Sequence, residues 1–277
     1  MKEEPILLRD FLDNSEFVPL EQLNKKPYGQ VICYPKYGVN ELGKRLKELK
    51  KLKVTAIEFS GKKVVSGLPV LGKGCVGIVA IAYKKNERIA IKIRRVDADR
   101  MRMQHEAEML KKANVVNVGP NLLDVSDNFL IMEFIEGILL PQWVNTLRGK
   151  ETKSRVQRVL RAVLEQSWSL DKLGLDHGEL SRAPKHIIVD ANEKPWIVDF
   201  ETASVNRKVS NVTSICQYLF IGSQIAKTIQ KKLGKIDRTK LIQALRDYKQ
   251  KRTRGSFEKI LMTCTLQNVW KEQNGIE

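Results

Sequence analysis

The sequence predicts an α+β fold in which a mainly antiparallel β region precedes a mainly helical region. Apolar runs with strand-like alternation, separated by glycine and polar turns, recur between residues 54 and 134. After residue 150, apolar residues recur instead at helical spacing, and the last fifty residues read as basic amphipathic helices. A chain of 277 residues can bury a core as one large domain or two modest ones.

The first half of the chain predicts one helix and then several strands. Asn40 is a candidate helix cap, because Leu42, Leu46 and Leu49 follow on one helical face, and the strand-like segment VTAIEFSGKKVV comes next. From residue 68, two alternating apolar runs joined by KKNER predict a glycine-rich hairpin and a further strand. The segment DADRMRMQHEAEMLKKA then predicts a helix with acidic residues at its start and basic residues at its end.

The second half predicts one more buried strand followed by helices and a short hairpin. NFLIMEFIEG is typical of a buried strand that runs into a link ended by glycine. Apolar spacing between Ser154 and Leu173 predicts a helix that Gly174 closes as its C-cap. HIIV and PWIV predict two short strands around the turn DANEK.

Charge and cysteine usage narrow the functional classes. The net charge is +17, and Ser223–Glu277 alone carries 13 Lys and Arg against 5 Asp and Glu. An uneven basic surface favours a polyanionic partner such as RNA, although a lysine-rich solvated surface explains the same composition. The four cysteines are far apart without a CxxC pair, which argues against disulfides and zinc. Apolar runs too short for a bilayer and an acidic start predict a cytoplasmic protein without a membrane partner.

A glycine-rich segment, GKGCVGIV, lies between two strand-like runs and carries the pattern GxGxxGxV. Gly72, Gly74 and Gly77 lack a β-carbon, so backbone N–H groups there can approach phosphates closely, and Val79 completes the pattern. A dinucleotide fingerprint of this kind opens a helix, whereas this segment opens a strand. The pattern therefore favours a phosphate-binding strand pair over a Rossmann fold.

A lysine in the next strand is a candidate phosphate ligand. Lys92 stands in IAIK, fifteen residues after Gly77, and shares a strand face with the small residue Ala90. Such a face can admit a flat base, although an edge-strand lysine that reaches water is the ordinary alternative. A buried lysine needs a counter-charge, which Glu106 or Glu108 in the following helix can supply, and we prefer Glu106. The alternative is an exposed helix carboxylate.

The order of six motifs resembles the protein-kinase-like family. They are the glycine-rich loop, the lysine of IAIK, the helix glutamate, the hinge-like IMEFIEG, HGEL and VDFE. HG in place of HR before the acid is similar to RIO kinases, the small kinase of the KEOPS complex and aminoglycoside phosphotransferases. The whole pattern is most similar to an archaeal group of predicted serine/threonine kinases.

This resemblance implies a bilobal protein-kinase-like fold and three segments. Residues 1–65 form an N-terminal helix and strand extension. Residues 66–136 form a small, mainly antiparallel β N-lobe with one key helix, the glycine-rich loop and the hinge. Residues 137–277 form a mainly helical C-lobe with the catalytic loop, the DFE motif and the basic C-terminal helices.

The resemblance also implies ATP and Mg²⁺ as cofactors and assigns roles to matching residues. Lys92 holds the α and β phosphates, Glu106 fixes Lys92, Asp199 binds Mg²⁺, and Glu179 occupies the position of the catalytic base. Met132 corresponds to the gatekeeper, and Glu133 to Ile135 supply the backbone that binds adenine. The expected nucleotide-binding residues are Gly72, Lys73, Gly74, Cys75, Gly77, Val79, Ala90, Lys92, Glu106, Met132, Glu133, Phe134 and Ile135.

Three positions depart from the family pattern. Glu179 stands where aspartate is usual, which adds one methylene. His186 falls where the family has asparagine as a second metal ligand, and imidazole is a poor ligand for the hard ion Mg²⁺. Glu201 replaces the glycine of DFG and either adds a carboxylate near the metal or points to solvent. His177 is expected to support the loop through hydrogen bonds.

The resulting hypothesis is an ATP- and Mg²⁺-dependent atypical serine/threonine protein kinase, associated with RNA or a ribonucleoprotein through its basic C-terminal region. Its protein substrate is not named by the sequence. One alternative is a small-molecule phosphotransferase of the aminoglycoside or sugar type, although those usually carry an acidic C-terminal lobe. The other is a pseudokinase that binds nucleotide in a structural or RNA-binding role, which the three departures would suit.

Overall fold

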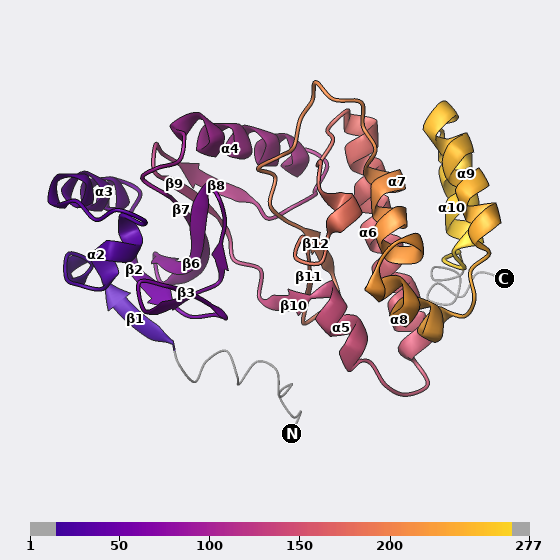
Figure 1. Ribbon diagram of the computed structural model, residues 1–277, viewed down its shortest axis with the longest axis horizontal. Helices are drawn as coiled ribbons and strands as arrows, with labels where there is room; N and C mark the ends of the chain where they lie inside the picture. The colour runs from indigo at the N-terminus through magenta and orange to yellow at the C-terminus, as the bar shows by residue number, and fades with distance from the viewer. Residues whose placement is uncertain (1–14, 268–277) are drawn as a thin grey trace. The chain divides into compact units, whose positions relative to one another are not determined.

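The computed structural model describes residues 15–267, whose contacts divide the chain into two compact units (Figure 1). The first unit comprises Met1–Lys111 and Asn121–Phe134, and the second comprises Lys112–Pro120 and Ile135–Glu277. The first is built mainly on an antiparallel sheet and the second mainly on helices, which confirms the predicted fold class. The boundaries expected at residues 65 and 136 stay a prediction. None of the described helices is long and apolar enough to cross a membrane.

The first unit contains an antiparallel sheet with the strand order β1-β2-β6-β7-β9-β8, and β5 pairs with β6 beside this path. A separate hairpin, β3–β4, packs nearby. The strands are β1 (Glu16–Pro19), β2 (Val54–Phe59), β3 (Lys63–Val65), β4 (Leu68–Val70), β5 (Gly72–Lys73), β6 (Gly77–Lys84), β7 (Glu87–Arg94), β8 (Leu122–Val125) and β9 (Phe129–Glu133). The helical elements are η1 (Leu20–Gln22), α2 (Tyr28–Ile32), α3 (Val39–Lys51) and α4 (Arg100–Asn114), which continues into the second unit.

The predicted hairpin around KKNER is confirmed as β6–β7. Lys84 pairs with Glu87, so Lys85 and Asn86 form a two-residue turn. Their φ angles are 52° and 66°, as the turn type that matches the twist of paired strands requires. Eight consecutive residue pairs follow from this turn and fix which residues of β7 face the core.

Helix α3 has the expected buried face but a different start. Leu42 and Leu49 are buried in the core on one side of the sheet, as the helical spacing predicted. The helix begins at Val39, and its N-cap is Gly38 in an extended conformation, so the Asn40 cap was wrong. The chain turns helical two residues earlier than the pattern suggested, which places Asn40 inside the first turn.

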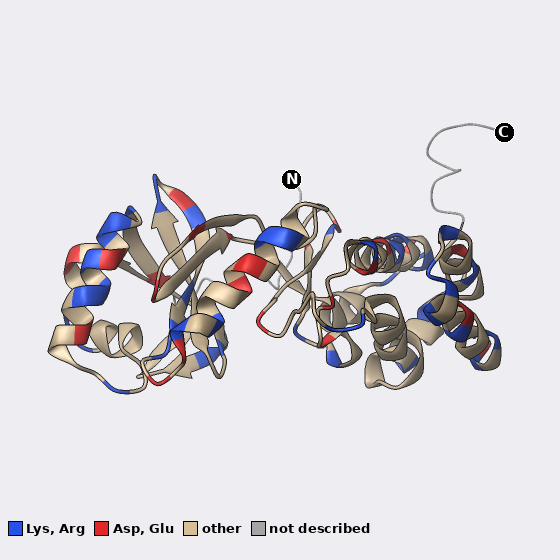
Figure 2. Ribbon diagram, turned by 90° about the horizontal axis from the view of Figure 1, so that it is seen from above, with Lys and Arg blue, Asp and Glu red and all other residues tan. Residues whose placement is uncertain are grey.

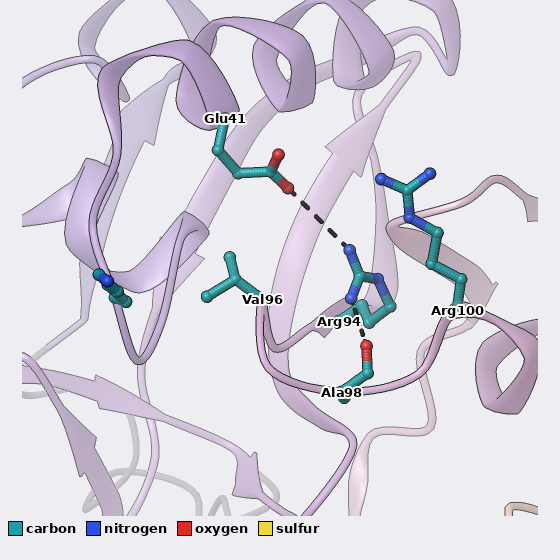
Figure 3. Close-up of a pocket in the computed structure, with 6 residues that line it drawn as sticks. Glu41, Arg94, Val96, Ala98 and Arg100 are labelled. Atoms are coloured by element: carbon teal, nitrogen blue, oxygen red, sulfur yellow. Dashed lines mark hydrogen bonds and ion pairs between the residues drawn. The ribbon is translucent and has the colours of Figure 1, made fainter.

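Two buried arginines tie α3 to the end of β7. Arg45 donates from Nη1 to the carbonyls of Ile32 and Arg94, at 2.8 and 2.5 Å, and from Nε to Glu41 at 2.8 Å. Arg94 and Glu41 also border a cavity of about 430 Å³ (Figure 3). The cavity is lined by Lys36, Glu41, Arg94, Val96, Ala98 and Arg100, none of which is a predicted site residue.

The helices of the second unit pack around α6 (Thr152–Leu173). A small antiparallel sheet lies beside the same helix. The predicted helix and its cap are confirmed, because Gly174 follows in the left-handed conformation with φ 79°. The predicted pair HIIV and PWIV forms β11 (Ile187–Asp190) and β12 (Pro195–Ile197), beside β10 (Gly137–Leu139). The other elements are α5 (Leu140–Thr146), η2 (Leu180–Arg182), α7 (Asn211–Cys216), η3 (Gln217–Ile221), α8 (Gln224–Leu233), α9 (Arg238–Lys251) and α10 (Arg254–Thr263).

Candidate active site

The glycine-rich segment forms a tight strand pair. β5 pairs with the start of β6, and Gly74 N–H donates to the Gly77 carbonyl at 2.8 Å to close the turn. A β-carbon on Gly77 would lie 2.9 Å from both the Ile93 carbonyl oxygen and Lys92 Cγ, so a side chain there would displace the lysine stem. Lys73 and Cys75 are exposed on this turn. Gly77 is therefore required by its close approach to Lys92.

Lys92 forms a buried ion pair with Glu106. Lys92 Nζ lies 2.6 Å from Glu106 Oε2, and the two side chains are 6% and 4% exposed. The isoleucines on either side of Lys92 belong to the core on the opposite face of the sheet, which turns the lysine toward α4. Glu108 is exposed. Of the two candidate carboxylates, the helix therefore directs Glu106 to the lysine.

The residues expected to contact the base share one face of the sheet. Val79 lies opposite Lys92 across β6 and β7, and Met132 lies opposite Ala90 across β7 and β9. Residues directly opposite each other in antiparallel strands, and residues two apart along a strand, point to the same face. The strand register thus brings together Val79, Ala90, Lys92 and Met132. Their contact with a nucleotide stays a prediction.

The hinge-like segment falls where the first unit ends. Glu133 is the last residue of β9, and its carboxylate accepts from the backbone N–H and the Nδ2 of Asn121 at 3.1 and 2.8 Å. The guanidinium of Arg88 stacks on the ring of Phe134 with 4.8 Å to its centroid. Ile135 begins the second unit. The side chains of Glu133 and Phe134 are thus held by contacts within the first unit, and the chain enters the second unit at Ile135.

In the second unit, the HG sequence lies in a buried loop. His177 is fully buried, and its Nε2 lies 3.1 Å from the Val198 carbonyl oxygen. Burial, with a smaller contribution from His186, lowers the pKa of His177 to about 4, so the ring is neutral at pH 7. Gly178 has φ 92°, and a β-carbon there would lie 2.9 Å from Thr202 Oγ1. The predicted supporting role of His177 agrees with these contacts.

A carboxylate on α6 anchors this loop through hydrogen bonds. Asp171 accepts hydrogen bonds from the hydroxyl of Tyr248 at 2.8 Å and from Nδ2 of Asn211 at 2.8 Å. Asn211 in turn accepts from the His177 N–H at 2.8 Å and donates to the Leu175 carbonyl at 2.7 Å. Burial raises the pKa of Asp171, while the donated hydrogen bonds oppose the rise. Asp171, Asn211 and Tyr248 therefore hold the backbone beside Glu179 in place.

Asp176 makes a second anchor that sequence reasoning missed. Its carboxylate accepts from Arg207 Nε at 2.6 Å and from the Ser210 N–H at 2.8 Å. Its backbone also pairs with Ser204 in both directions. Only its position directly before the HG motif could have drawn attention to it. No local pattern marks Arg207 or Asn211, whose partners lie more than thirty residues away.

Glu179, His186 and Asp199 converge at the end of this loop. His186 Nε2 lies 3.0 Å from Glu179 Oε2 and 3.7 Å from Asp199 Oδ2. The His186 side chain is 1% exposed, whereas the carboxylates are 40% and 35% exposed. Burial lowers the pKa of His186, against the opposing effect of the two carboxylates Asp199 and Glu179. The three side chains therefore offer two carboxylate oxygens and one buried imidazole nitrogen as potential metal ligands.

Asp199 adopts a conformation that few residues other than glycine adopt. Its φ is 70°, which for a side chain with a β-carbon costs about 1–3 kcal/mol. A carboxylate oxygen of Glu201 lies within 4.8 Å of one of Asp199, so Glu201 adds a carboxylate beside it. Backbone strain of this kind persists at sites where it positions a functional side chain. Asp199, whose sequence match implies a metal ligand, is one of several non-glycine residues in the described part of the chain that have a positive φ.

The donor groups suit the cofactors that the resemblance implies. Carboxylate oxygens are the ligands that Mg²⁺ prefers, and Asp199 and Glu179 supply them in the second unit. A buried ammonium beside a glycine turn suits phosphate oxygens, and Lys92 and Gly77 supply that arrangement in the first unit. These residues fit magnesium and a nucleotide. When bound, the metal would neutralise phosphate charge during transfer.

Two comparisons identify relatives of the chain. A model of the RIO domain matches residues 80–214, a range that runs from β6 into α7. The uncharacterised protein MJ1211 of Methanocaldococcus jannaschii is 35% identical over 112 residues, which cover 40% of this chain and 91% of that protein. RIO domains are atypical kinases and ATP-binding phosphotransferases within the protein-kinase-like proteins. The chain therefore belongs to the RIO domain family, one of the groups within the protein-kinase-like family that HG in place of HR predicted.

Proposed function

We propose that this chain is an ATP- and Mg²⁺-dependent phosphotransferase that acts on serine or threonine hydroxyls of a protein. The observation that carries the proposal is the buried ion pair between Lys92 and Glu106, next to a turn in which Gly77 leaves no room for a side chain. Burying a charge pair costs desolvation free energy, so stability alone is a weak reason for this pair, and an ammonium held beside a glycine-rich turn suits phosphate oxygens.

Each unit contributes different chemistry to the proposed reaction. In the first unit, Lys92 neutralises charge on the nucleotide phosphates and Glu106 keeps its ammonium in place. In the second unit, Asp199 would hold the metal, while Glu179 accepts a hydrogen bond from the substrate hydroxyl and takes its proton. The hydroxyl oxygen forms a bond to the γ phosphorus as the bond from that phosphorus to the ADP oxygen breaks. The proton ends on Glu179.

Labelled ATP tests this function directly. We expect purified protein with Mg²⁺ and γ-labelled ATP to transfer label to itself or to a protein in a fractionated lysate of its source cell. Acid hydrolysis should recover the label as phosphoserine or phosphothreonine. Label on a small molecule alone would favour the small-molecule phosphotransferase. Nucleotide binding without any transfer or hydrolysis would favour the pseudokinase.

We propose further that the C-terminal helices bind RNA through its phosphates. Many of the cations in Ser223–Gln267 are exposed along α8, α9, α10 and the link between α8 and α9; Lys and Arg are blue in Figure 2. They are Lys227, Lys231, Lys235, Arg238, Lys240, Arg246, Lys249, Lys251 and Lys259. Arg254 differs, because Glu165 and Glu258 bind its guanidinium. Clustered exposed cations attract a polyanion, and the phosphate backbone of RNA is a polyanion.

Salt dependence tests the RNA proposal. Neutralising about five phosphates predicts a slope of log K against log salt of roughly −3.5 to −4.5 for a structured RNA. Replacing Arg246, Lys249 and Lys251 with glutamine should reduce its magnitude by about 2 to 3. Substitution is preferable to truncation, because α9 and α10 bury Tyr248 and Phe257.

A matched triple variant controls for net charge. Lys44, Lys47 and Lys51 are exposed on α3 of the first unit, and their replacement with glutamine removes the same charge. We expect this control to keep a slope close to that of the wild-type protein. Equal slopes for the two triple variants would mean that the C-terminal cations are only a solvated surface.

A further inference from the structure

His186 has unused metal-binding capacity at the end of the catalytic loop. Its side chain is 1% exposed, and within residues 15–267 neither ring nitrogen makes a hydrogen bond of good geometry, although the ring is in close contact with the backbone and the carboxylate of Glu179. Leaving a buried ring nitrogen unpartnered is unfavourable, so native structures rarely do it without a reason. Nε2 nevertheless points at two carboxylates, Glu179 and Asp199.

The three side chains have the spacing of ligands around one ion. One nitrogen or oxygen from each lies within 4.8 Å of the others. In a six-coordinate site with bonds of about 2.1 Å, neighbouring ligand atoms are about 3.0 Å apart. His186 Nε2 and Glu179 Oε2 are 3.0 Å apart, and Nε2 and Asp199 Oδ2 are 3.7 Å apart. The first distance fits adjacent ligands, and the second lies between adjacent and opposite ligands.

We propose that Glu179, His186 and Asp199 form a binding site for a divalent transition-metal ion of the Mn²⁺ type, in preference to Mg²⁺. Imidazole nitrogen binds first-row transition metals well and Mg²⁺ poorly, whereas carboxylates bind both. In protein kinases an asparagine amide oxygen, a harder donor, completes the corresponding second metal site. His186 stands directly before β11 at that place, so this chain replaces an oxygen ligand with a nitrogen ligand.

The metal's role in transfer rests on the proposed function, but its binding does not. A carboxylate has two oxygens, so Glu179 can give Oε2 to the ion and keep Oε1 for the substrate hydroxyl. Three protein ligands leave further positions on a six-coordinate ion for phosphate oxygens or water. The assignment therefore gives the metal site that Asp199 and Glu179 form a preference for a transition-metal ion, and it leaves the roles of Lys92 and Glu106 unchanged.

Electron paramagnetic resonance of Mn²⁺ tests this site without any nucleotide. The full-length, tag-free protein is stripped with a chelator and titrated with Mn²⁺, and loss of the free-ion signal measures binding. We expect the protein to bind one Mn²⁺ ion. Displacing it should take at least a tenfold excess of Mg²⁺. Pulsed measurements should detect ¹⁴N coupling from a directly bound imidazole, and protein grown with ¹⁵N-histidine should replace it with ¹⁵N coupling.

Two variants assign the nitrogen to one histidine. His186→Asn should abolish the ¹⁴N coupling and weaken Mn²⁺ relative to Mg²⁺ by about tenfold or more, with the circular dichroism spectrum unchanged. His105→Asn, which changes an exposed histidine on α4, is the matched control and should bind Mn²⁺ as the wild-type protein does. Should His186→Asn fail to fold, the isotope experiment on the wild-type protein still decides whether a histidine nitrogen binds the ion.

The outcomes separate this site from the proposed function. Bound Mn²⁺ without histidine nitrogen coupling, or equal affinities for Mn²⁺ and Mg²⁺, would overturn the site. In that case, transfer from labelled ATP with Mg²⁺ alone would leave the phosphotransferase in place. Nitrogen-coupled Mn²⁺ in a protein that transfers no phosphate would keep the metal site and overturn the phosphotransferase.

Discussion

Lys92→Met is expected to weaken the binding of magnesium–ATP by about 10- to 100-fold. The variant removes the ammonium while keeping a long apolar stem, and a hydrogen bond to a charged group contributes about 1.5–3 kcal/mol. Calorimetric titration with ATP in the presence of Mg²⁺ measures the effect. Unchanged affinity would mean that the nucleotide binds elsewhere.

The same substitution is also expected to destabilise the first unit, for a separate reason. Glu106 is buried, and removing the partner of a buried charge costs about 3–5 kcal/mol. The double variant Lys92→Met/Glu106→Gln removes both charges and should recover most of this stability, measured by urea unfolding. ATP affinity should stay low in the double variant. Recovery of stability and affinity together would contradict a direct role for the ammonium.

Asp199→Ala supplies a second control on the nucleotide site. If Asp199 holds the metal, its removal should eliminate the increase in ATP affinity that Mg²⁺ produces while affinity without Mg²⁺ stays the same. The folded state of this variant becomes more stable only if alanine allows the backbone to leave the strained φ of 70°. An unchanged effect of Mg²⁺ would exclude Asp199 as its ligand.

Local patterns predicted most individual elements because each carries its own signal. The positive φ angles of Lys85 and Asn86 suit a tight hairpin, and Gly174 ends α6 in the left-handed conformation. Strand partners carry no such signal. β2 pairs with β6 in the sheet, although the β3–β4 hairpin separates these two strands along the chain, and β1 pairs with β2. Alternation gives the buried face of a strand but not the strand beside it.

The candidate site divides in the same way between local motifs and distant supports. Lys92, Glu179 and Asp199 lie in short motifs, so their positions were visible in the sequence. Asp171 was not, because a carboxylate on an amphipathic helix is normally solvated. It is buried here because Asn211 and Tyr248, forty and seventy-seven residues away, donate hydrogen bonds to it. Such long-range supports depend on tertiary packing.

Glu179 decides whether this loop performs chemistry. A group that takes the hydroxyl proton acts mainly in the transition state, so its loss should reduce the rate of transfer and leave the affinity for ATP without metal nearly unchanged. Glu179→Gln keeps the size of the side chain and removes its basicity. We expect phosphoryl transfer to fall by about 100-fold or more, the usual scale for acid–base assistance.

The aspartate variant and a remote control complete the test. Glu179→Asp restores the residue usual in the family but shortens the side chain that places Oε2 3.0 Å from His186 Nε2, so we expect a rate between those of the glutamine variant and the wild type. Glu108→Gln, which changes an exposed carboxylate on α4, should transfer phosphate as the wild type does. Initial rates from labelled ATP, compared at saturating nucleotide, measure all three. A wild-type protein that transfers no label, together with a Glu179→Gln variant that differs only in thermal stability, would establish a nucleotide-binding pseudokinase instead.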